Sequence, residues 1–202
     1  MSVTEAVRVA VKRQPPGEPF SNTMVLGLGP RAAVDQALSR LVAEGAVSRV
    51  CRGVYMRPRT SRLVGNVPAD PEAVIRAIAA STGEIVVPTG ATAANQLGLT
   101  TQVPLGHVYR TSGRSRDVRV GRTVVRLRHA SARQLAMANT PAGAALAALR
   151  YLGPGVVTER TISQVRRRIG RRQFAVLRGS TGVMPAWLSD KMWHYSKAAH
   201  TP

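Results

Sequence analysis

Most ionisable side chains in this chain are arginines. Its 202 residues hold 29 Lys and Arg against 10 Asp and Glu, a formal net charge of +19, and only Lys12, Lys191 and Lys197 are lysines. A coding bias towards arginine would explain that preference, but it would not remove the acids. A field of this strength attracts phosphate groups or an acidic protein surface. We therefore expect a polyanionic partner.

The residue types used in metal binding and acid–base catalysis are scattered along the sequence. No Cys pair and no His-x-x-x-His spacing occurs, so no metal site is predicted. The histidines are His107, His129, His194 and His200. A nucleic-acid-processing enzyme would need clustered carboxylates for metal binding or acid–base catalysis. Here the carboxylates are isolated in the sequence, and only folding could bring them together: Glu84, Asp117, Glu159 and Asp190. We predict a protein without enzymatic activity.

The single cysteine and the hydropathy of the chain indicate its compartment. Cys51 has no partner for an internal disulfide. No apolar run approaches the length of a membrane span or of a signal-peptide core. We expect a cytoplasmic protein that does not enter a membrane.

Two glycine-containing segments look like phosphate-binding loops but lack their other parts. Gly27, Gly29 and Ala32 match G-x-G-x-x-A, yet no full strand precedes them and no acid follows about twenty residues later. The turn around Thr89 lacks the lysine of a P-loop, and such a threonine more often caps a helix. No cofactor is predicted.

The arginines of the N-terminal part fall on a pattern of three helices and a hairpin. The predicted helices are residues 3–12, a short one capped by Ser21 or Asn22 that runs to about Leu26, and one from Arg31 to Gly45, and the predicted strands are 46–51 and 54–56. That order is typical of a winged helix-turn-helix, which we assign to residues 1–62. Phe20 is expected to anchor its core.

Polar residues of this unit are candidates for DNA contact. Val34, Leu38 and Leu41 form one apolar stripe of the third helix, so its polar residues face outward. The expected DNA-binding residues are Arg31, Gln36, Ser39 and Arg40 on the helix, with Arg49, Arg52 and Arg57 on the hairpin. A winged helix used only for protein contact is the alternative.

The remaining chain predicts a second, mixed α/β domain, residues 63–202, after a polar and breaker-rich passage over 59–70. Its expected elements are helices from Pro71 to Gly83, 91–97, 131–138, 141–152 and 158–169, and strands 84–87, 103–111, 118–120 and 124–129. The fold class is therefore α+β, with a small antiparallel sheet and a C-terminal helical bundle. Trp187 and Trp193 are expected to cover that bundle, and the alternative is that they present a patch to a partner.

The densest positive charge lies on the last of these predicted helices. Ile162, Val165 and Ile169 take its core positions. The arginines outside that stripe, or just after it, are Arg160, Arg166, Arg167, Arg168, Arg171 and Arg172. Such a run would hold nucleic acid or the acidic surface of a partner protein, and both readings stay open.

Several segments of the chain resemble the AbiEi family of antitoxins from bacterial toxin–antitoxin pairs. They are residues 38–41 (LSRL), 49–55 (RVCRGVY), 88–99 (PTGATAANQLGL), 101–104 (TQVP) and 109–113 (YRTSG). The resemblance implies a non-enzymatic antitoxin whose N-terminal domain binds operator DNA and represses its own operon. It also implies that the C-terminal domain neutralises a nucleotidyltransferase-like toxin. A stand-alone winged-helix regulator without a toxin is the alternative.

Overall fold

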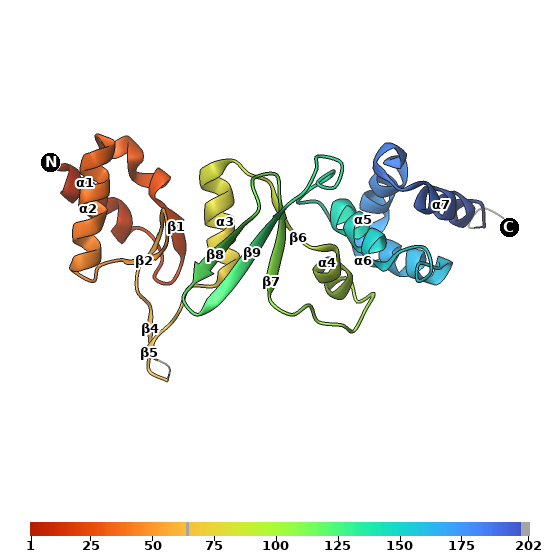
Figure 1. Cartoon of the computed structure of the whole chain (residues 1–202), viewed down its shortest axis with the longest axis horizontal. Coiled ribbons are helices and arrows are strands. Elements are labelled where there is room, and N and C mark those ends of the chain that lie inside the picture. The colour runs from red at the N-terminus through yellow and green to blue at the C-terminus, as the bar shows by residue number, and fades with distance from the viewer. Residues whose placement is uncertain (64, 199–202) are drawn as a thin grey trace. The chain divides into compact units, whose positions relative to one another are not determined.

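The computed structural model describes residues 1–63 and 65–198, which fold as a mixed α+β structure (Figure 1). The chain forms two compact units. One contains residues 1–84 and 116–126, and the other contains residues 85–115 and the chain from residue 127 onward. We describe each unit by itself.

The first unit opens with the predicted helices and hairpin, together with a strand that the sequence pattern did not predict. The elements are α1 (Val3–Lys12), β1 (Pro19–Ser21), the 3-10 helix η1 (Asn22–Leu28), α2 (Arg31–Ala43), β2 (Ser48–Cys51) and β3 (Val54–Met56). β3 lies between β1 and β2 and pairs antiparallel with both. β1 is only three residues long and pairs with β3, which is distant in sequence. No periodic pattern of apolar residues therefore predicts this strand.

Apolar side chains from every part of this segment meet in one core. Val34, Leu38 and Leu41 of α2 are fully buried, as their spacing predicted. Phe20 is also buried, and its ring stacks on Tyr55 with the centroids 6.2 Å apart. Complete burial of each such side chain contributes roughly 1.5–3 kcal/mol to stability. This burial holds α2 with its polar face outward.

Local chemistry sets the ends of α2 and η1. Pro30 immediately precedes α2, and Gly45 follows it with a φ of +71°, a conformation that glycine adopts without strain. The Ser21 hydroxyl accepts a hydrogen bond from the Thr23 amide at 3.2 Å and caps η1. Ser21 and Gly45 thus mark helix ends, as the sequence predicted.

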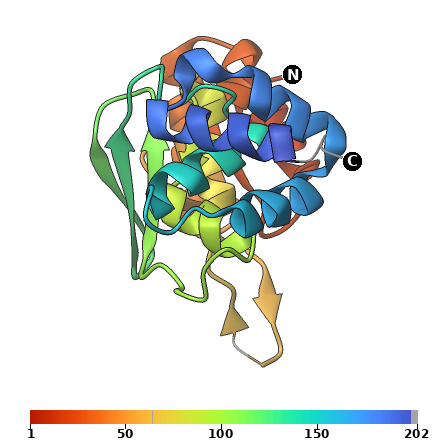
Figure 2. The ribbon, with the colours of Figure 1, turned by 90° about the vertical axis from the view of Figure 1, so that its right-hand side faces the viewer.

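The first compact unit extends beyond the predicted boundary near residue 63. The passage after β3 contains β4 (Thr60–Ser61) paired with β5 (Gly65–Asn66), drawn as a separate small ribbon in Figures 1 and 2. α3 (Pro71–Thr82) follows, capped by Asp70, and contacts β1 and β3. β8 (Arg116–Val120) contacts β2. These contacts join α3 and β8 to the N-terminal elements, which hydrophobic pattern alone did not reveal.

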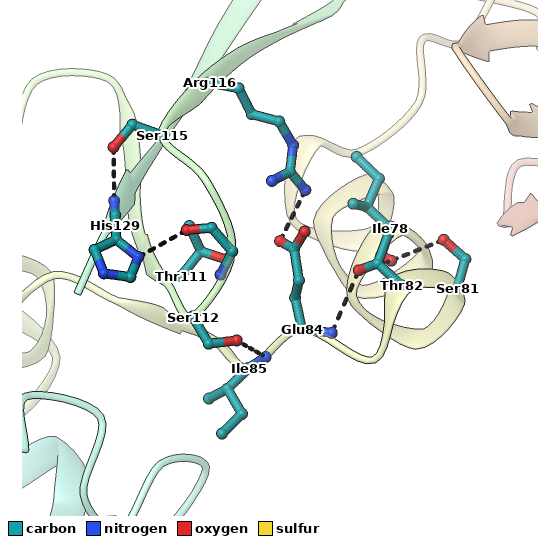
Figure 3. Close-up of polar contacts among 11 residues, drawn as sticks. Ile78, Ser81, Thr82, Glu84, Ile85, Thr111, Ser112, Ser115, Arg116 and His129 are labelled. Atoms are coloured by element: carbon teal, nitrogen blue, oxygen red, sulfur yellow. Dashed lines mark hydrogen bonds and ion pairs between the residues drawn. The ribbon is translucent and has the colours of Figure 1, made fainter. Parts of the chain in front are cut away.

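A four-stranded sheet has the order β6-β7-β9-β8, with β6 (Val86–Pro88) antiparallel to β7 (His107–Thr111) and β9 spanning Thr123–His129. β7 begins at His107, so residues 103–106 of the predicted strand lie outside it. Within the first unit, the Arg116 guanidinium reaches the Glu84 carboxylate at 2.8 Å (Figure 3). That pair ties β8 to the end of α3, because Glu84 follows α3 by two residues.

The second unit adds α4 (Gly90–Gln96), α5 (Pro141–Leu152), α6 (Glu159–Gly179), η2 (Thr181–Val183) and α7 (Ala186–Ala198). α4 and α5 pack closely, since a Cβ on Gly90 would lie 2.5 Å from the carbonyl oxygen of Ala147. The Thr89 hydroxyl caps α4 by accepting from the Thr92 amide at 3.4 Å. The threonine is therefore a helix cap, as the sequence predicted.

One helix prediction in this unit was wrong, and another was followed by a helical segment that was not predicted. Residues 131–138 form turns rather than a helix, and Met137 and Asn139 have φ values of +59°, which a right-handed helix cannot contain. The predicted helix 158–169 is the first segment of α6, and it ends at Ile169 because Gly170, with a φ of +78° and a ψ of 163°, is not helical. A second helical segment, which the sequence did not predict, continues to Gly179. Figure 1 shows α6 changing direction. The residues after the break bury Phe174 and Leu177, which stabilises a second helical segment.

The helices of this unit enclose their own core. Its fully or nearly fully buried members include Leu146, Leu149, Ile162, Val165, Leu177 and Leu188. Trp187 packs partly against that core, in line with the expectation that it covers the bundle. Trp193 does not cover the bundle, because it is 56% exposed. The Lys197 ammonium lies 4.7 Å from the centre of its ring.

Candidate nucleic-acid interface

The candidate interface is the solvent-facing side of α2 together with the β2–β3 hairpin. The four polar residues predicted on α2 are all exposed, opposite the buried stripe of Val34, Leu38 and Leu41. They are Arg31, Gln36, Ser39 and Arg40. Arg49 and Arg52 of the hairpin region are exposed as well. Six of the seven predicted DNA-binding residues are thus accessible.

Asp35 contacts two of the predicted residues on this face of α2. The Arg31 Nε lies 3.7 Å from an Asp35 carboxylate oxygen, and the two side chains are 73% and 47% exposed. The Ser39 hydroxyl donates to the Asp35 main-chain carbonyl at 2.9 Å. An exposed pair of this kind contributes little to stability and exchanges readily for another anion. Arg31 is therefore available to a phosphate.

A groove of about 510 Å³ joins α2 to the hairpin. Its lining residues are Asn22, Arg31, Asp35, Ser39, Arg49, Arg52, Gly53 and Tyr55. Four of the seven predicted residues meet there: Arg31, Ser39, Arg49 and Arg52. Three guanidiniums face one carboxylate, so the groove carries a net positive charge. Planar guanidiniums match phosphate oxygens in geometry as well as in charge.

The other three predicted residues lie outside this groove. Gln36 and Arg40 are exposed on α2 but do not line it. Arg57 is half-buried, and its Nη1 donates to the carbonyl oxygens of Lys12 at 3.0 Å and Gln14 at 2.8 Å. A cation there satisfies carbonyls at the end of α1 and complements its dipole. Arg57 thereby fastens the hairpin to α1.

Two lining residues of the groove were not among the predicted site residues. The sequence predicts Asn22 only as a possible helix cap and Tyr55 only as a strand residue. Tyr55 is paired with both Phe20 and Arg49 across the three-stranded sheet. No local pattern indicates that these side chains border the groove, because their positions depend on the packing of β3 against β1 and β2.

A second hollow of about 620 Å³ lies beside the hairpin within the first unit. Its lining includes Cys51, Arg52, Glu84 and Arg116, the last two being the ion pair of Figure 3. Cys51 is half-buried, and burial raises the pKa of its thiol, while the charge of Arg49 partly opposes that effect. The thiol is therefore a weak nucleophile at neutral pH.

The predicted arginine cluster of the C-terminal part lies on both segments of α6. Arg160, Arg167, Arg168, Arg171 and Arg172 are exposed and Arg166 is half-buried. Arg166 and Arg171 line a pocket of about 170 Å³, and Arg167 and Arg168 line another of about 390 Å³. Arg160 and Arg172 line neither. The structure thus divides the predicted cluster into separate cationic hollows.

Among residues 1–63 and 65–198, no three His, Cys, Asp or Glu side chains lie close enough together to hold a metal ion. Over the same residues, no helix combines the length and hydropathy that crossing a membrane requires.

Comparison with known proteins identifies a family. The sequence matches no curated protein. Among solved structures, the chain aligns with the crystal structure of RV2827C protein from Mycobacterium tuberculosis, with a TM-score of 0.45 and 12% identity, over 99% of this chain and 78% of that one. A family model described as a family of unknown function, DUF6088, matches residues 7–175. Because that match covers most of the sequence, this chain belongs to the DUF6088 family.

Proposed function

We propose that this protein is an autoregulatory antitoxin. Its N-terminal winged helix-turn-helix, residues 1–62, binds operator DNA and represses its own operon. Its C-terminal domain, residues 63–202, neutralises a nucleotidyltransferase-like toxin in the cytoplasm, and the protein itself has no enzymatic activity. The observation that carries the DNA-binding part is the cationic groove between α2 and the β2–β3 hairpin.

The element order supports a winged helix-turn-helix. α1, η1 and α2 are followed by the β2–β3 hairpin, with β1 completing a three-stranded sheet. α2 exposes its polar face, and an α-helix fits the major groove of B-DNA. In this docking, Gln36 and Arg40 reach base edges, and Arg31, Arg49 and Arg52 bind the flanking phosphates. Arg57 has a supporting role, since it holds the hairpin against α1.

The toxin-binding part of the proposal is supported by the AbiEi resemblance and by the charge of α6. Residues 160–189 contain seven arginines and no Asp or Glu. The exposed arginines of this stretch form a surface that an acidic protein face would complement. The direct partner in this proposal is therefore a toxin with an acidic docking surface.

Growth rescue tests the antitoxin proposal. The gene next to that of this protein is expressed alone and together with it, and growth is followed. We expect growth to stop with the neighbouring gene alone and to recover when both are present. A double charge reversal, R167E with R171E, should prevent recovery and leave operator binding unchanged, because those arginines lie in the second unit.

A single charge-reversal control is R122E, which places one reversed charge on an exposed turn outside α6. It should rescue growth like the wild type. Failure of the wild-type protein to rescue growth, combined with retained operator binding, would favour the alternative of a stand-alone regulator. Loss of operator binding in the R167E/R171E protein would instead assign the α6 surface to DNA.

A further inference from the structure

The second unit contains a small pocket whose lining has three arginines and no acid. It has a volume of about 170 Å³ and is lined by Arg166, Arg171, Phe174, Ala175, Arg178, Tyr195 and Ser196. None of the ion pairs found within residues 1–63 and 65–198 includes Arg166, Arg171 or Arg178. Three like charges around one hollow repel each other unless an anion joins them.

The break in α6 brings these arginines together. Arg166 and Arg171 are five residues apart, which places them about 140° apart around an unbroken helix. At Gly170 the backbone leaves the helical conformation, with a φ of +78° that favours glycine. The two arginines therefore border one pocket despite their spacing. Arg171, Phe174 and Arg178 share one face of the second segment, because they are three, four and seven residues apart.

Hydroxyl groups and an aromatic ring complete the lining. The Tyr195 hydroxyl accepts a hydrogen bond from the Ser163 hydroxyl at 3.2 Å. That bond and the adjacent Arg166 lower the pKa of Tyr195, as expected where the surroundings favour negative charge. Phe174 is 7% exposed and meets the Tyr195 ring edge-on at 5.9 Å, so both rings are held in place. The pocket is thus a cationic hollow with two packed aromatic rings in its lining.

We propose that this pocket binds the terminal phosphate group of a phosphate monoester, carried by a free mononucleotide or by the end of a nucleic-acid strand. A phosphate monoester carries a charge of about −1.5 to −2 at neutral pH, which complements three guanidiniums better than a carboxylate does. The volume equals the space of roughly five or six water molecules. It accommodates a phosphate group and leaves the nucleoside outside.

The proposal is independent of DNA binding at α2 and of any toxin. Binding is measured by calorimetry on the full-length protein at low salt, with adenosine 5′-monophosphate as ligand and adenosine as its phosphate-free counterpart. We expect the monophosphate to bind and adenosine not to bind. Equal binding of the two, or no binding of the monophosphate, would overturn the assignment.

Single substitutions locate the binding. R171Q and R178Q each remove one guanidinium from the lining at an exposed position, where folding is not at stake. Each should weaken binding of the monophosphate about 10-fold or more, as expected for hydrogen bonds to a charged group. The matched control is R172Q, which removes the same charge from an exposed neighbour outside the pocket. It should change affinity less than about twofold. If R172Q weakens binding of the monophosphate as much as R171Q does, the ligand is attracted by the net charge of the protein. That result would overturn the assignment of the pocket as the binding site.

A second pair of ligands separates the two sources of the phosphate. A 5′-phosphorylated trinucleotide and its 5′-hydroxyl counterpart are compared with the mononucleotide. Tighter binding of the phosphorylated trinucleotide assigns the pocket to a strand end, and tighter binding of the mononucleotide assigns it to a free nucleotide. If the two trinucleotides bind equally and the monophosphate does not bind, the pocket does not recognise a terminal phosphate.

Discussion

Replacing Arg49 and Arg52 with alanine should reduce the salt dependence of operator binding by about two units. Both side chains are exposed and line the groove beside α2. Each arginine that neutralises a phosphate releases counterions, and its loss lowers the slope of log K against log salt by about 0.9. Between 50 and 200 mM salt, one contact corresponds to about a 3.5-fold change in affinity, so two correspond to about 12-fold.

Fluorescence anisotropy with duplex DNA from upstream of the gene, at several salt concentrations, measures this slope. The R76A/R122A double variant removes the same charge from two exposed residues outside the groove and should keep the wild-type slope. The reasoning is refuted if the R49A/R52A protein keeps the wild-type slope. It is also refuted if the control loses as much, because net charge rather than the groove would then govern binding.

Gln36 distinguishes base recognition from phosphate binding on the same helix. It is exposed on α2 and uncharged, so Q36A should leave the salt slope unchanged. It should reduce the preference for operator over scrambled DNA by about 1–3 kcal/mol, the usual value of a bidentate base contact. An equal loss of affinity for both duplexes would show that Gln36 does not recognise bases.

Three further outcomes follow from packing and burial. L38A should lower the free energy of unfolding in urea by about 3–5 kcal/mol, because Leu38 is fully buried, and a loss below about 1 kcal/mol would contradict that packing. G143A should cost about 1–3 kcal/mol in the same assay, since its Cβ would lie 2.1 Å from the Met137 carbonyl oxygen, whereas G155A, with open space, should change stability by less than about 0.5 kcal/mol. At pH 8, Cys51 should react with iodoacetamide more slowly in the folded than in the urea-unfolded protein, because its raised pKa keeps the thiol protonated until a higher pH, and equal rates would refute this.

Local sequence patterns predicted the helices that have a proline at their start and a glycine just after their end. Pro30 and Gly45 bracket α2, and Pro71 and Gly83 bracket α3. The same reasoning failed for residues 131–138, where helical spacing is present. There, two residues adopt positive φ and the chain forms turns before Thr140 caps α5. Met137 also packs closely against Gly143 of α5, a tertiary contact that local helix propensity does not contain.

By itself, the sequence determined the net positive charge, the apolar stripe of α2 and the outward direction of its polar residues, because charge and helical period are local properties. Only the tertiary structure decided which arginines share a surface. It placed Arg31 beside Arg49 and Arg52, and it recruited Arg57 to the end of α1. It also joined Arg166 to Arg178 across the break at Gly170. Such groupings depend on strand pairing and helix packing between distant residues, which no local pattern contains.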